Sequence, residues 1–143
     1  MIMLSKCDIN NIDHVGIAVK NIDRSIDFFT TVFGVPKPIV SVITDQQVKA
    51  TLIAVGETRI ELLEPTSPDS PVGKFLKNKG EGLHHLAFNV DSISDKLEVL
   101  KELNIDLIDQ HPREGLSGTI AFIHPKSVFG VLTELVESDS SAD

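Results

Sequence analysis

Two histidines and two glutamates occupy matching positions in the two halves of this chain. His14 and His85 are related by an offset of 71 in the numbering, and each begins a run of alternating residues typical of a strand. Glu61 and Glu134 are related by an offset of 73, and each lies in an apolar run. Because imidazole nitrogens and carboxylate oxygens are common ligands of divalent metals, these four side chains predict one metal site.

The strand neighbours of the two histidines favour a cleft. Adjacent residues in a strand point to opposite faces, so His14 shares a face with Gly16 and Ala18. By the same rule, His85 shares a face with Ala87 and Asn89. A face with small side chains beside a polar one leaves room for a ligand, whereas a packed core face would carry branched residues.

The two glutamates need a compensating partner if they are buried. An unpaired, desolvated carboxylate costs several kcal/mol, so it becomes protonated, pairs with a cation or binds a metal. Taken singly, each histidine could be a core residue and each glutamate an edge residue facing water. The repeated placement of all four favours the metal site. The only cysteine is Cys7, so the sequence offers no pair of thiolates for a structural zinc site. A metal held by nitrogen and oxygen donors alone, with coordination positions left open for water or substrate, indicates catalysis.

The elements that must position these residues repeat as well. A helical pattern in the first half recurs in the second at the same offset as the histidines; its members are Ile22, Ile26, Phe29 and Val32, then Ile93, Leu97, Leu100 and Leu103. Strand-like runs follow each helix, at 38–44, 48–55 and 58–64, then at 106–109, 118–123 and 131–136.

The repeat predicts an α+β protein. Two βαβββ modules, at about 9–66 and about 80–137, form a half-open barrel around a metal cleft within one domain spanning 1–143. A turn-rich linker with a short helical stretch ending at Lys79 joins the modules.

The composition excludes several classes of partner. Hydrophobic residues make up 41% and charged residues 24% of the 143 residues, as in globular proteins. The net charge of −8 disfavours a nucleic-acid partner. No apolar run approaches the roughly 18 residues of a membrane span. We therefore expect a cytoplasmic protein with neither nucleic acid nor membrane as a partner.

Six segments carry a resemblance to a known superfamily. They are DHVGIAV at 13–19, IELLEP at 60–65, DSP at 69–71, GLHHLAF at 82–88, FIHPK at 122–126 and GVLTEL at 130–135. In these six segments the chain resembles the vicinal oxygen chelate superfamily, whose members are built from paired βαβββ modules and include glyoxalase I. Within that superfamily it resembles the methylmalonyl-CoA epimerases.

The resemblance implies an isomerase that interconverts (2R)- and (2S)-methylmalonyl-CoA by removing the C2 proton through a metal-stabilised enolate. The positions matching His14, Glu61, His85 and Glu134 bind the metal in that family, with Glu or Gln at the second, and the position of Glu134 also transfers the proton. The metal is one divalent ion, Co²⁺ or Zn²⁺ first and Mn²⁺ or Ni²⁺ as alternatives. An acyl-CoA substrate and a homodimer are further implications.

Three alternatives remain. A lactoylglutathione lyase of the glyoxalase I type shares the two histidines and two glutamates, but the turn at 124–130 resembles the epimerase turn. A ring-cleaving dioxygenase would hold Fe(II) with two histidines and one carboxylate, which the fourth donor disfavours. A binding module without catalysis would lack some of the ligands.

One position departs from the epimerase pattern. Some epimerases place a second catalytic carboxylate on the strand before that of Glu61, and the matching residue here is Lys49. The second proton donor is therefore expected to be Lys49 or a water molecule.

Overall fold

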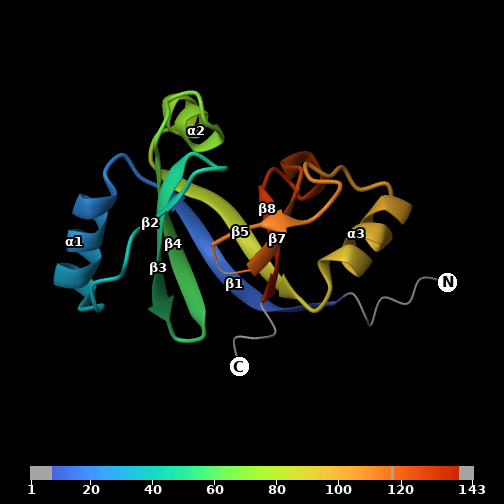
Figure 1. Ribbon diagram of the computed structural model, residues 1–143, viewed down its shortest axis with the longest axis horizontal. Coiled ribbons are helices and arrows are strands. Elements are labelled where there is room, and N and C mark those ends of the chain that lie inside the picture. Colours follow the sequence, from blue (N-terminus) through green and yellow to red (C-terminus); the bar gives the residue numbers. More distant parts are fainter. Residues whose placement is uncertain (1–7, 117, 139–143) are drawn as a thin grey trace. The chain divides into compact units, whose positions relative to one another are not determined.

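The computed structural model describes residues 8–116 and 118–138, so Cys7 lies outside the described residues (Figure 1). The elements, in chain order, are β1 (Ile9–Ala18), α1 (Ile22–Phe33), β2 (Ser41–Ile43), β3 (Val48–Val55), β4 (Thr58–Pro65), α2 (Pro71–Lys79), β5 (Gly82–Val90), α3 (Ile93–Glu102), β6 (Arg113–Glu114), β7 (Gly118–Ile123), the 3-10 helix η2 (Pro125–Ser127) and β8 (Thr133–Ser138). Within the described residues, none of the helices has the length and apolar character needed to cross a membrane. The chain divides into two compact units, an N-terminal unit, His14–His84, and a C-terminal unit, Met1–Asp13 with His85–Asp143.

The N-terminal unit is built on strands in the order β2-β3-β4-β1. Strands β1 and β4 are parallel, while β3 is antiparallel to both of its neighbours. Helix α1 covers one face of these strands, and its Ile22 and Ile26 pack with Ile53 and Leu62 in a buried core (Figure 1). Burial of this apolar helix face stabilises the unit and fixes α1 against β4.

The C-terminal unit repeats this plan. Its strands lie in the order β5-β8-β7-β6, with β5 parallel to β8. Helix α3 packs on one face through Ile93 and Leu97, which contact Leu135 of β8 (Figure 1). The first residues of β1 belong to this unit, where the Asn10 side chain donates a hydrogen bond to Asn89.

Polar side chains cap the N-termini of both helices that cover the strands. The Asn21 side chain caps α1 by accepting from the N–H of Arg24, and Gly34 ends that helix in the left-handed conformation. The Ser92 side chain caps α3 in the same way. Helix α3 ends at the C-cap residue Leu103, and Asn104 follows it with a left-handed φ of 58°.

The predicted α+β class and the repeated βαβββ module are confirmed, but one predicted strand is wrong. Residues 106–109 contribute only a single bridge, from Leu107 to Ile123. The carboxylate of Asp109 accepts a hydrogen bond from the N–H of Phe122 at 2.8 Å. A side chain therefore replaces the backbone carbonyl that would accept this bond in a continued strand pair. The corresponding strand forms later, as β6.

Candidate active site

The first histidine–glutamate pair lies within the N-terminal unit. Gly16 of β1 is the register partner of Glu61 of β4, and His14 lies two residues before Gly16 on the same strand face. His14 Nε2 and Glu61 Oε1 are 3.5 Å apart. Both residues are buried, with 3% and 6% of their surfaces exposed.

The second pair lies within the C-terminal unit and has the same construction. Ala87 of β5 is the register partner of Glu134 of β8, and His85 again lies two residues earlier. His85 Nε2 and Glu134 Oε1 are 3.0 Å apart, and both residues are buried. The rings of His85 and Phe122 form a T-shaped pair, with 5.7 Å between ring centroids, which favours one orientation of the imidazole.

The two distances fit a pair of donors that share one metal ion. Two ligands bonded at about 2.1 Å, with an angle between about 90° and 110° at the metal, lie roughly 3.0 to 3.4 Å apart. The observed separation of 3.0 Å lies at the lower end of this range, and that of 3.5 Å lies just above its upper end. All four side chains are buried and each offers one ligand atom, so the donors present suit a divalent metal.

The face of the C-terminal unit that carries Glu134 combines an apolar cluster with polar side chains, among them His85 and Asn89 of β5. Ala87, Ile120 and Val136 form a buried cluster, with Phe122 packed against it. Strand alternation and the β7–β8 register place these residues on the same face as Glu134. Arg113 of β6 is the register partner of Ile120, and its guanidinium lies over the Phe122 ring, 5.5 Å from the ring centroid, so a cation lies on this face as well.

The structure does not bring Lys49 alongside Glu61. Glu61 is in register with Leu52, whereas Lys49 is in register with Glu64. Positions 49 and 52 are three apart on β3 and therefore point to opposite faces. The ammonium of Lys49 lies 3.7 Å from the carboxylate of Glu64, with 44% of its side chain exposed.

Two glutamates without a predicted role make a matching pair of contacts. Glu64 accepts the N–H of Ile22 at 2.9 Å, and Glu137 accepts the N–H of Ile93 at 2.8 Å. Glu64 and Glu137 are separated by the same 73 positions as Glu61 and Glu134. This shared offset is the sequence feature that could have indicated an equivalent role for the two residues.

The other histidines lie elsewhere. His84 packs its ring against Phe75 of α2, with 4.9 Å between ring centroids, on the strand face opposite to that of His85. His111 is exposed in the segment before β6.

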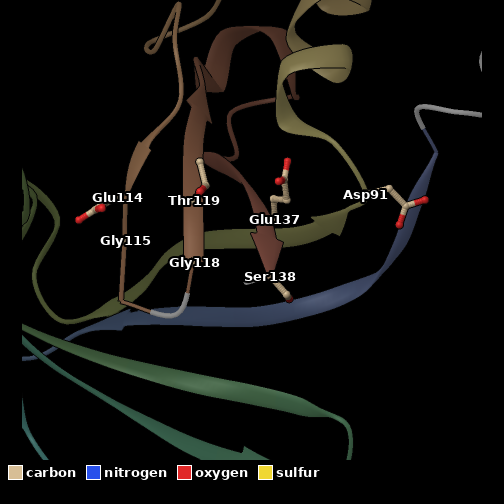
Figure 2. Close-up of a pocket in the computed structure, with 7 residues that line it drawn as sticks. All are labelled: Asp91, Glu114, Gly115, Gly118, Thr119, Glu137 and Ser138. Atoms are coloured by element: carbon tan, nitrogen blue, oxygen red, sulfur yellow. The ribbon is translucent and has the colours of Figure 1, made fainter. Parts of the chain in front are cut away.

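Each unit also has a surface pocket whose lining contains none of the predicted ligands. The pocket in the C-terminal unit has a volume of about 470 Å³ (Figure 2) and is lined by Asp91, Glu114, Gly115, Gly118, Thr119, Glu137 and Ser138. The pocket in the N-terminal unit, of about 430 Å³, lies at the β1–α1 turn and includes Lys20, Arg24 and Phe28.

Comparisons with known proteins assign the chain to a family. A family model for the Glyoxalase/Bleomycin resistance protein/Dioxygenase superfamily matches residues 13–122. The mitochondrial methylmalonyl-CoA epimerase of Dictyostelium discoideum is 37% identical over 139 residues, which cover 94% of this chain and 82% of that protein. The chain belongs to the methylmalonyl-CoA epimerase family. The predicted resemblance and the assignment as an isomerase are thereby confirmed.

Two further relatives extend this result. The uncharacterized protein YqjC of Bacillus subtilis (strain 168) is 41% identical over 129 residues, covering 90% of this chain and 92% of that protein. A solved structure of a methylmalonyl-CoA epimerase in complex with methylmalonyl-CoA and NH4⁺ superposes with a TM-score of 0.89 at 34% identity, covering 93% of this chain and 97% of that one. The epimerase family therefore shares both sequence and fold with nearly the whole chain.

Proposed function

We propose that this protein interconverts (2R)- and (2S)-methylmalonyl-CoA, with His14, Glu61, His85 and Glu134 holding one divalent metal in the cleft of a half-open barrel. The observation that carries the proposal is the pair of buried histidine–glutamate contacts at equivalent positions in the two modules, each with the donor separation of two ligands on one ion. Membership of the epimerase family and a solved relative that binds methylmalonyl-CoA support the choice of substrate.

The roles of the residues follow from their surroundings. A bound dication would supply electrostatic stabilisation of the negative charge that develops on the substrate oxygens when the C2 proton leaves. Glu134 would accept that proton, because its carboxylate is buried at the proposed site beside His85 and the matching position transfers the proton in the family that the chain resembles. His85, oriented by Phe122, keeps the carboxylate in place. Glu61 and His14 serve as ligands.

Return of a proton to the opposite face of C2 requires a second donor. The sequence leaves Lys49 and water as candidates. Because Lys49 pairs with Glu64 on the strand face opposite to Glu61, the placement favours water.

The proposal also covers the metal, the assembly and the compartment. Nitrogen and oxygen donors without thiolate suit Co²⁺ or Zn²⁺, with Mn²⁺ or Ni²⁺ as alternatives. We place the protein in the cytoplasm as a homodimer. Metal analysis of the purified protein and light scattering during size-exclusion chromatography test the metal and the dimer.

An isotope experiment tests the reaction. Protein loaded with Co²⁺ or Zn²⁺ is incubated with methylmalonyl-CoA in deuterated water, and we expect deuterium at C2 together with loss of stereochemical purity. A parallel reaction offers the hemithioacetal of methylglyoxal and glutathione. Turnover of the hemithioacetal without exchange at C2 would overturn the proposal in favour of a lactoylglutathione lyase.

A further inference from the structure

Each glutamate assigned to the metal is followed three positions later by a second glutamate, Glu61 by Glu64 and Glu134 by Glu137. Residues three apart in a strand face opposite ways, so the second glutamates lie on the helix-covered faces. Building on the proposed function, we propose that Glu64 and Glu137 are positioning residues that set the geometry of the metal site through the strands that carry its ligands.

The contacts of these two glutamates with the helices are equivalent, and the other carboxylate oxygen of Glu64 lies 3.7 Å from the ammonium of Lys49. Glu64 Oε1 accepts the backbone N–H of Ile22, the first residue of α1, at 2.9 Å. Glu137 Oε1 accepts the backbone N–H of Ile93, the first residue of α3, at 2.8 Å. Figure 2 shows the Glu137 side chain extending from the end of β8 toward the start of α3. In both units, therefore, a carboxylate binds the positive end of a helix dipole with a charge-assisted hydrogen bond.

These bonds tie the two ligand-bearing strands of each unit together. Helix α1 follows the strand of His14 after a short turn, 19–21, and α3 follows the strand of His85 after the turn 91–92. A bond from the glutamate strand to the start of the helix therefore opposes sliding of one strand along the other. A slide of half a residue moves a ligand by about 1.6 Å, whereas metal–ligand distances tolerate only about 0.2 Å.

Helix capping alone does not account for the contacts. The N-cap role is already filled by Asn21 in α1 and by Ser92 in α3, each of which accepts a local N–H. The glutamate bonds instead join residues 42 and 44 positions apart in the sequence. Their effect is on tertiary register rather than on the helix end.

The test compares variants of the full-length protein loaded with Co²⁺. Glu64→Met and Glu137→Met remove the acceptor but keep the side-chain length, whereas Glu64→Gln and Glu137→Gln keep an acceptor oxygen. Asn21→Ala and Ser92→Ala are the matched controls, because they weaken the same helix ends without touching β4 or β8. The measurements are the Co²⁺ Kd, the visible absorption spectrum of bound Co²⁺, and Tm without metal.

We expect the Met variants to bind Co²⁺ about tenfold more weakly or worse, and with a shifted spectrum, as is typical when a group that orients metal ligands is lost. The Gln variants should stay near the wild type, and the cap controls should lower Tm without changing Kd or spectrum. Wild-type Kd and spectrum in the Met variants would overturn the inference while leaving the proposed function intact. Failure of the wild type to bind any of the four metals would instead overturn the proposed function.

Poor folding of the Met variants does not block the test. Glu64→Asp and Glu137→Asp keep the charge but shorten the side chain by one methylene, so the carboxylate no longer reaches the helix N–H at hydrogen-bond distance. These variants should reproduce the weaker Co²⁺ binding and the shifted spectrum. Unchanged binding and spectrum in both Asp variants would overturn the inference.

Discussion

At the scale of single residues, Glu61 and Glu134 have equivalent positions and different expected roles. Both lie diagonally opposite a histidine on a parallel strand pair, and both are buried. Glu134 also shares its strand face with an apolar cluster that includes Ile120 and Val136. The resemblance to the epimerases gives proton transfer to the position of Glu134, which favours Glu134 as the base.

Replacing each glutamate by glutamine separates the ligand from the base. An amide oxygen can still coordinate a metal, so Glu61→Gln and Glu134→Gln should both retain the ion. An amide cannot accept the C2 proton, and loss of a positioned general base costs about 10²- to 10⁴-fold in rate. We expect deuterium exchange at C2 to survive in Glu61→Gln and to fall by that factor in Glu134→Gln. Equal exchange rates at full metal occupancy would remove Glu134 from the base role.

The side chain of Lys49 gives a second prediction at this scale. If water returns the proton, Lys49→Met should epimerise methylmalonyl-CoA at nearly the wild-type rate. If Lys49 is the donor, the rate should fall by about 10²- to 10⁴-fold, as for other general acids. Chiral analysis of the product over time distinguishes the two results. Lys101→Met, on the outside of α3 and paired only with an exposed carboxylate among the described contacts, is the control.

At the scale of elements, β8 joins the metal face to the core. Leu135 is 1% exposed and packs against α3, while its neighbour Glu134 faces the opposite way toward His85. The alternation of strand side chains lets one strand serve both purposes. Loss of core packing at Leu135 should therefore lower the stability of the whole C-terminal unit.

We expect Leu135→Ala to lower the free energy of unfolding by about 2 to 5 kcal/mol, the usual cost of a buried Leu→Ala change. Leu103→Ala is the matched control, because Leu103 is 49% exposed, and surface changes of this kind stay within about 0.5 kcal/mol. Urea denaturation of the metal-free protein measures both. Equal free-energy changes in the two variants would contradict the position of Leu135 in the core.

At the scale of the whole molecule, we expect binding of the proposed metal to be coupled to folding. A ligand that binds only the folded protein stabilises it by mass action, by about 2.7 kcal/mol when the free ion is at one hundred times its Kd. Removal of the metal with a chelator should therefore lower Tm, and added Zn²⁺ or Co²⁺ should restore it. Calorimetry with elemental analysis checks this, with one ion per chain expected. A Tm that changes neither on addition of chelator nor on addition of Zn²⁺ or Co²⁺ would contradict the four-residue metal site.

The sequence predicted the repeated module well, because amphipathic spacing and strand alternation are local consequences of which side chains must be buried. The predicted strand at 106–109 was wrong, since no local pattern shows that the Asp109 side chain accepts the hydrogen bond that a backbone carbonyl would accept in a strand pair. The sequence also aligned Glu64 with Glu137 without giving them a function. Their partners, Ile22 and Ile93, are far away in the sequence, and such a bond exists only after the strands and helices have packed.

The sequence by itself therefore determined the fold class, the duplication and the four residues offered as metal ligands. All three follow from residue types that recur at offsets of 71 or 73 in the numbering. Only the tertiary structure decided which residues meet. It paired His14 with Glu61 and His85 with Glu134, and it placed Lys49 beside Glu64. The physical reason is strand register: pairing fixes both the partner and the face of every side chain, and a shift of one residue would reverse the face.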